Sequence, residues 1–199
     1  MITTKRYKEI EYYVFEADGQ TAKKPVIIHI HGAGSRGNDI SVAIKSNPIV
    51  KYFEEDKKFP FMVYAPQCRA DTWFDIYEQL LEFIDFVKES EGTDKLFLSG
   101  ISMGGYCSWQ LLMSRPQLFE KAVICCGGGM YWNAGRIKTP VKAFCGALDT
   151  TVLPEESKKM VDAVNAKGGR AELIVYDDLG HNVWDRVYSD EKNYEWFLK

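Results

Sequence analysis

The sequence lacks the long apolar run that a membrane-spanning helix needs, since no run reaches about 18 residues. It also lacks an excess of basic residues: 25 Lys and Arg against 28 Asp and Glu give a formal net charge of −3. No basic surface for nucleic acid is therefore expected. The first ten residues contain neither an apolar segment nor a small-residue cleavage site, so they do not predict a signal peptide. We expect a protein that binds neither membranes nor nucleic acid.

Cysteine is scarce and irregularly spaced. The odd count of five, one adjacent pair and the lack of a Cys-x-x-Cys motif argue against a disulfide framework and against a zinc site. Cysteines in apolar stretches usually behave as small buried hydrophobes. We therefore expect reduced thiols and a cytoplasmic location. The five are Cys68, Cys107, Cys125, Cys126 and Cys145.

Internal repeats, low-complexity tracts and linkers are also absent, so the 199 residues are expected to form a single domain, residues 1–199. Short β-branched runs alternate with longer amphipathic stretches. The runs predict strands at 10–15, 25–30, 61–65, 95–99, 121–126, 141–145 and 171–176, of which the first is antiparallel. The amphipathic stretches predict helices at 73–89, 103–114 and 154–167, and a last one after residue 182.

This alternation predicts an α/β fold with a mostly parallel central sheet covered by helices on both faces. In such sheets, ligands bind beyond the carboxyl ends of the strands. Residues that directly follow the predicted strands are therefore the candidates for chemistry.

Gly100-Ile-Ser-Met-Gly104 lies between a predicted strand and a predicted helix. A serine on such a sharp turn adopts a strained conformation that lifts its hydroxyl clear of the sheet. Side chains at Gly100 or Gly104 would collide with neighbouring backbone. Ser102 is thus the candidate nucleophile, and the backbone N–H of Met103, at the start of the helix, is a candidate oxyanion donor.

A serine hydroxyl needs a base, and the sequence offers only three histidines. His29 lies inside a predicted strand and is expected to be a packed core residue. His31 begins a glycine-rich turn and is expected to brace it. His181 follows the last predicted strand and is the candidate base.

The carboxylate that orients the base should also follow a strand, between the serine and the histidine in sequence. Asp149 does so. Asp177 and Asp178 are alternatives close to His181, but they lie on the exit of the same strand and are expected to form a solvated turn.

The loop His31-Gly-Ala-Gly-Ser-Arg-Gly37 follows an earlier strand, where the second oxyanion donor normally lies. The N–H of Ala33 is the first candidate and that of Gly34 the second. Its glycine spacing also fits a nucleotide-binding loop, but no acidic residue closes a strand about twenty residues further on.

Three side chains near these loops are candidate substrate contacts: Trp184, Trp73 and Gln67. For the two tryptophans, and for Tyr131 and Trp132, packing in the core or at the rim is an equally good interpretation.

Taken together, these motifs resemble the α/β-hydrolase superfamily. The similar segments are residues 31–39, 65–68, 100–106, 146–149 and 180–181, in that order. More narrowly, the chain resembles a predicted esterase/peptidase branch near feruloyl esterases, polyhydroxybutyrate depolymerases and phospholipase/carboxylesterases. Ser35 departs from the acidic residue expected in this branch. The short segment between Cys126 and Val141 leaves room for a minimal cap or none.

The resemblance implies a serine esterase that uses Ser102, His181 and Asp149 through an acyl-enzyme, with Met103 and the Ala33 loop as oxyanion donors. Its partner would be a small-molecule ester, with no metal or organic cofactor; the sequence does not indicate an oligomeric state. Two alternatives stay open. One is a small serine peptidase of prolyl-oligopeptidase type, and the other is a ligand-binding protein that keeps the fold without turnover.

Overall fold

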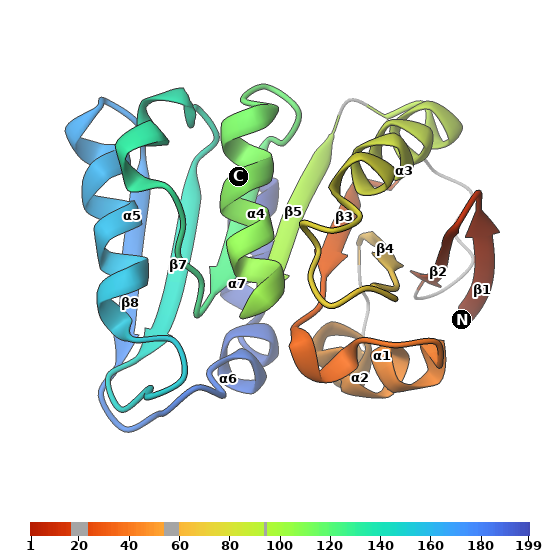
Figure 1. Ribbon diagram of the computed structural model, residues 1–199, viewed down its shortest axis with the longest axis horizontal. Helices are drawn as coiled ribbons and strands as arrows, with labels where there is room; N and C mark the ends of the chain where they lie inside the picture. Colours follow the sequence, from red (N-terminus) through yellow and green to blue (C-terminus); the bar gives the residue numbers. More distant parts are fainter. Residues whose placement is uncertain (17–23, 54–59, 94) are drawn as a thin grey trace.

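The computed structural model describes residues 1–16, 24–53, 60–93 and 95–199. These residues form one eight-stranded sheet with helices on both faces (Figure 1). The strand order is β1-β2-β4-β3-β5-β6-β7-β8. The strands are β1 (Ile2–Tyr7), β2 (Ile10–Glu16), β3 (Val26–Ile30), β4 (Met62–Pro66), β5 (Leu96–Ile101), β6 (Lys121–Cys125), β7 (Val141–Gly146) and β8 (Ala171–Tyr176).

The sheet is mostly parallel, as predicted. β1 pairs with β2 and β2 with β4 in antiparallel fashion, whereas every pairing from β4 across to β8 is parallel. The structure adds an edge strand, β1, that the sequence analysis missed. Its residues are largely exposed and polar, so it carries little of the apolar pattern that marks the other strands.

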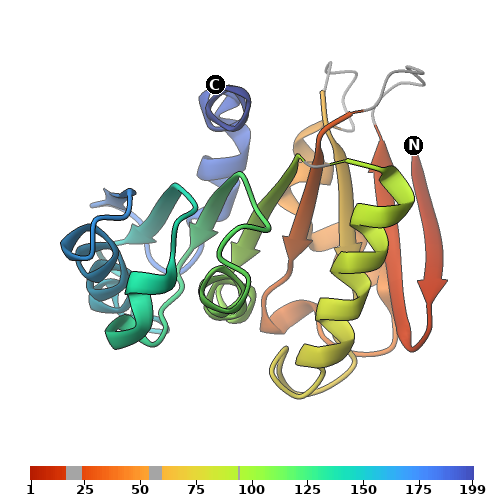
Figure 2. The same ribbon diagram turned by 90° about the horizontal axis from the view of Figure 1, so that it is seen from above.

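Two apolar cores lie on opposite faces of the sheet. One packs α3 (Tyr77–Glu91), α4 (Met103–Ser114) and α5 (Pro154–Ala166), and the other packs α1 (Ile40–Ser46), α2 (Pro48–Phe53), α6 (Trp184–Ser189) and α7 (Glu191–Leu198). Figure 2 shows α3, α4 and α5 on one side and α7 on the other. Two 3₁₀ turns complete the set, η1 (Ala33–Ser35) and η2 (Tyr131–Arg136). Only η2 lies between β6 and β7, in agreement with a minimal cap.

Two helical predictions need correction, and two short helices are added. The helix expected at 73–89 begins at Tyr77, because Trp73 is fully buried and its indole N–H donates to the His31 carbonyl at 2.9 Å instead. α1 and α2 were not predicted; each has only six or seven residues, too few for a clear periodicity. The last helix is two helices, because the Asp190 side chain caps α7 by accepting from the N–H of Lys192.

All five cysteines are free and buried. Burial raises the pKa of the Cys145 thiol to about 11 and raises that of each of the other four above its usual value. Among the described helices, none is long and apolar enough to cross a membrane.

The carboxyl ends of the parallel strands lie at the same end of the sheet. β3 lies between β4 and β5, so the chain crosses from one side of β3 to the other on leaving β4. Such a switch point opens a crevice beyond the carboxyl ends of the neighbouring strands. The loop after β3 and the turn after β5 both lie at this crevice.

Candidate active site

Ser102 occupies the turn between β5 and α4, and its backbone is strained. Its φ of 54° and ψ of −117° lie where side chains are rarely found. The two flanking glycines make the turn feasible: a Cβ on Gly104 would lie 2.0 Å from the Ile30 oxygen, and one on Gly100 would lie 2.5 Å from the Gly104 oxygen. Gly100 and Gly104 therefore have the role that the motif predicted.

The structure brings together the three residues named as nucleophile, base and acid. His181 Nε2 lies 2.9 Å from Ser102 Oγ, and His181 Nδ1 lies 2.7 Å from Asp149 Oδ2. A carboxylate accepts only, so Nδ1–H donates to it, and Nε2 is left to accept the serine proton. The Asp149 side chain is fully buried, whereas that of His181 is 23% exposed. This arrangement can take a proton from the Ser102 hydroxyl.

Asp149 is held as a carboxylate. Burial alone would raise its pKa, but hydrogen bonds from His181 and from the N–H groups of Val152 and Thr151 outweigh burial and lower it. The two backbone bonds, at 2.9 and 2.8 Å, go to Oδ1 and leave Oδ2 for the histidine. The rival Asp178 instead pairs with Arg186 at the surface.

Cys126 is a neighbour of this site that the sequence analysis did not single out. It follows β6 with a φ of 50°, and its Sγ donates to the His181 carbonyl at 3.2 Å. Its sulfur, one Asp149 oxygen and one His181 ring nitrogen lie within 4.8 Å of one another. Because burial raises the pKa of the thiol, Cys126 stays protonated and can donate, which helps to fix the backbone of the histidine loop.

The predicted oxyanion loop lies beside the nucleophile. A Cβ built on Gly32 would come 3.5 Å from the Ser102 Cβ. Ala33 begins η1 and Met103 begins α4, and the first N–H groups of a helix have no partner within it. In the part of the chain that the structure describes, neither N–H has a recorded acceptor. Both are available to a ligand oxygen.

Residues that directly follow β4 form hydrogen bonds that hold this loop in place. His31 Nε2 accepts from the Cys68 N–H at 3.0 Å, so Nδ1 carries the proton that bonds the Gly32 carbonyl at 2.8 Å. Gln67 Nε2 donates to the carbonyls of Ser35 and Gly37, at 2.7 and 2.9 Å. His31 therefore braces the turn, as expected, and Gln67 supports it.

The comparisons with known proteins find hydrolases. A family model described as serine aminopeptidase, S33, matches residues 65–134. A protein of Escherichia coli O157:H7, provisionally named carboxymethylenebutenolidase, is 29% identical over 99 residues, or 44% of this chain. That match spans only 36% of the relative's own length.

Two solved structures resemble the whole chain. A thermostable esterase has a TM-score of 0.79 at 25% identity, covering 100% of this chain and 62% of its own. A dienelactone hydrolase from Klebsiella pneumoniae subsp. pneumoniae MGH 78578 has a TM-score of 0.76 at 15% identity, covering 100% and 98%. The protein has the α/β-hydrolase fold. The fold that the motifs predicted is thus confirmed.

A cavity of about 420 Å³ opens beside Ser102, and we call it the Ser102 chamber. Its walls come from β3, the loop 31–35, the α1–α2 junction, the end of β5, the loops after β7 and β8, and the start of α6. Trp184 lines it and packs edge-on to the His181 ring, with centroids 5.4 Å apart, so it lies where the sequence analysis expected a substrate contact. The lining residues are His29, His31, Gly32, Ala33, Gly34, Ser35, Ser46, Asn47, Ile101, Ser102, Thr151, His181 and Trp184.

Two of the expected substrate contacts lie elsewhere. Trp73 is 0% exposed and Gln67 1% exposed, and neither lines the chamber. Both face the back of the candidate oxyanion loop, where their N–H groups bond its carbonyls. Both residues therefore support the loop and do not line the chamber.

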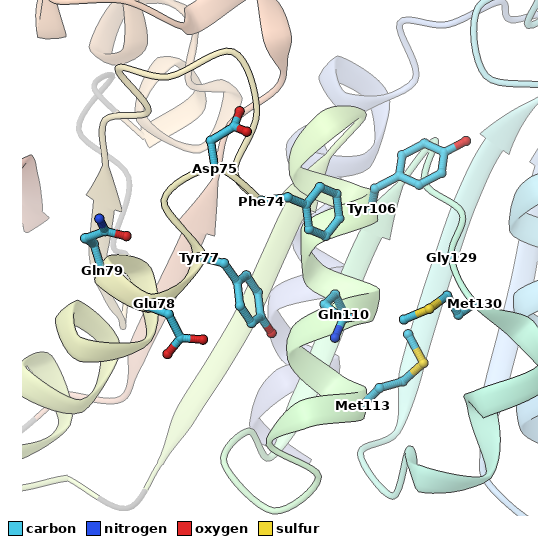
Figure 3. Close-up of a pocket in the computed structure, with 10 residues that line it drawn as sticks. All are labelled: Phe74, Asp75, Tyr77, Glu78, Gln79, Tyr106, Gln110, Met113, Gly129 and Met130. Atoms are coloured by element: carbon cyan, nitrogen blue, oxygen red, sulfur yellow. The ribbon is translucent and has the colours of Figure 1, made fainter.

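A second cavity, of about 670 Å³, runs along the outer side of α4 on the other face of the sheet. Figure 3 shows Phe74 and Tyr106 toward the start of the helix, with Met113 and Met130 further along. Neither Ser102 nor His181 lines this groove.

Proposed function

We propose that this α/β-hydrolase is a serine esterase that cleaves carboxylic esters through an acyl-enzyme. The observation that carries the proposal is the single imidazole of His181, which bonds Asp149 through one nitrogen and Ser102 through the other. The esterase and dienelactone hydrolase among the similar structures, and the lactone in the relative's name, support an ester as substrate.

The reaction follows from these contacts. Ser102 Oγ attacks the ester carbonyl while His181 Nε2 takes its proton. The tetrahedral oxyanion accepts hydrogen bonds from the N–H groups of Met103 and Ala33, with Gly34 as the alternative donor. Each such donor contributes roughly 3–4 kcal/mol in other enzymes. The intermediate collapses, and the departing alcohol takes the proton back from His181.

Deacylation repeats the steps with water. His181 removes a proton from the water, which attacks the acyl carbonyl. As the bond to Ser102 Oγ breaks, His181 returns the proton to Oγ and the acid is released. Asp149 stays ionised throughout and stabilises the imidazolium that forms in each half-reaction. The mechanism needs no metal or organic cofactor, and the five free, buried cysteines suit a reducing compartment such as the cytoplasm.

The test is hydrolysis of p-nitrophenyl acetate, butyrate and octanoate by the wild type and by Ser102→Ala. Ser90→Ala is a matched control, because Ser90 lies on α3 and bonds only the Val87 carbonyl in the described structure. We expect hydrolysis by the wild type and the control and none above background by Ser102→Ala. Equal rates in all three proteins would overturn the proposal.

The main alternative is a serine peptidase, which the description of the matching family model favours. The same three residues would then attack an amide. Peptide p-nitroanilides offered beside the esters separate the two: faster turnover of the anilides at matched concentration would favour the peptidase.

A fold that has lost turnover is the second alternative. A fluorophosphonate probe tests it directly, since covalent labelling requires an activated Ser102. Labelling of the wild type but not of Ser102→Ala would exclude this alternative.

A further inference from the structure

The Ser102 chamber has a mostly apolar surface that includes several polar side chains. Three of its polar side chains are almost completely buried: His29 is 1% exposed, Asn47 2% and Ser35 6%. The lining contains no Lys, Arg, Asp or Glu. The chamber therefore offers hydrogen bonds but no charge to a group that enters it.

The hydroxyl of Ser35 has one close partner, the Ser46 hydroxyl at 2.6 Å, and either of the two can be the donor. Ser46 Oγ can also donate to the Ala43 carbonyl at 3.3 Å. In either arrangement Ser35 Oγ keeps a lone pair that can accept a hydrogen bond in the chamber.

His29 provides a second polar atom. Its Nδ1 lies 2.9 Å from Ser99 Oγ, which in turn lies 2.5 Å from the Tyr188 hydroxyl. Burial keeps the ring neutral by lowering its pKa to about 3. A neutral imidazole has one donor and one acceptor nitrogen, and Nε2 has no recorded partner among the described residues.

These groups determine what the chamber can bind well. An alkyl group would exclude water from Ser35 and His29 without replacing its hydrogen bonds, which is costly. A carboxylate would be desolvated with no cation to pair with. A hydroxyl can donate to Ser35 Oγ and can exchange a hydrogen bond with the imidazole. The volume, about 420 Å³, lies near the lower end of ligand cavities and so favours a small group.

We propose that the Ser102 chamber receives a short, uncharged, hydroxyl-bearing group on one side of the scissile ester. This inference rests on the proposed esterase activity and specifies its substrate class. The hydroxyl can belong to the acyl part or to the alcohol part of the ester, and the test has one arm for each.

Each arm compares two esters that differ by a hydroxyl in place of a methyl group. The acyl arm pairs methyl 3-hydroxybutanoate with methyl 3-methylbutanoate, and the alcohol arm pairs 2-hydroxyethyl acetate with propyl acetate. Monomethyl succinate adds a carboxylate. We expect the hydroxyl member of one pair to have a kcat/KM about 10-fold higher than its partner, and the succinate ester to be the poorest substrate.

Ser35→Ala tests the residue, with Ser189→Ala as the matched control because Ser189 is exposed on α6 outside the chamber. The 10-fold preference should shrink toward unity in Ser35→Ala and persist in Ser189→Ala. The proposal is overturned if an active wild type shows no hydroxyl preference in either arm, if it prefers the succinate ester, or if Ser35→Ala keeps the full preference. Those outcomes leave the esterase assignment standing, whereas failure to hydrolyse even p-nitrophenyl acetate would overturn both.

Discussion

The two histidines at the end of β3 should make this protein lose stability on mild acidification. Burial lowers the pKa of His29 to about 3, with a smaller contribution from the His31 ring. Burial also lowers the pKa of His31 to about 4, although its bond to the Gly32 carbonyl acts in the opposite direction. In the unfolded chain both should titrate near the usual value of 6.5.

The sign follows from these values. Below pH 6.5 both histidines bind protons in the unfolded state but not in the folded state. The free energy of unfolding therefore falls as the pH falls. From pH 8 to pH 5 the loss is about 2 kcal/mol for each histidine and about 4 kcal/mol for both. That is a large part of the stability of a typical domain, about 5–15 kcal/mol.

The assay is urea unfolding followed by tryptophan fluorescence at pH 8, 6.5 and 5. We expect a midpoint roughly 1–2 M lower at pH 5 than at pH 8. His29→Gln should remove about half of this pH dependence, and His29→Gln with His31→Gln nearly all of it. The difference between each variant and the wild type isolates the two histidines from other titrating groups. A double variant with the pH dependence of the wild type would refute the reasoning.

Three further predictions concern the backbone around Ser102 and the loop beside it. Ser102→Gly should be about 1 kcal/mol more stable than Ser102→Ala in denaturant unfolding. Glycine relieves the backbone strain at this position, and that gain exceeds the cost of the added entropy of the unfolded chain. A glycine variant that is less stable than the alanine variant would contradict the strain. Gly104→Ala should cost more than about 3 kcal/mol, since its Cβ would meet the Ile30 oxygen at 2.0 Å. Gly34→Ala, with nothing within 4 Å of its Cβ, should have almost no effect on stability, and similar losses in the two variants would disprove the clash. Gln67→Leu should lower kcat about 10-fold with little change in KM, because it frees the oxyanion loop; a change in KM alone would indicate a substrate contact instead.

Much of the fold and of the candidate site could be predicted because both depend on local patterns. Apolar runs marked the parallel strands, and residues that follow such strands meet at one edge of the sheet. Ser102, Asp149 and His181 were found in this way although 32 and 79 positions separate their bonded pairs. The strained turn was readable because glycines flank the serine.

What could not be predicted depends on contacts between distant segments. Trp73 and Gln67 follow β4 at positions that suit a pocket wall. Their side chains point inward instead, because their N–H groups donate to carbonyls of the loop after β3. Cys126 has the composition of a core residue, and only the folded chain places its sulfur against the histidine loop. The chamber likewise arises because the buried strand residue His29 and the junction between the short helices α1 and α2 line the same cavity.

The five buried thiols should make the folded protein unreactive toward alkylating reagents, and this can be used to follow its local opening. Alkylating reagents react with thiolates, and every cysteine here is hidden from solvent with a raised pKa. The cysteines lie on or after β4, α4, β6 and β7, so each alkylation reports the opening of one part of the core. Mass-resolved labelling with iodoacetamide would therefore rank the elements by how often they open.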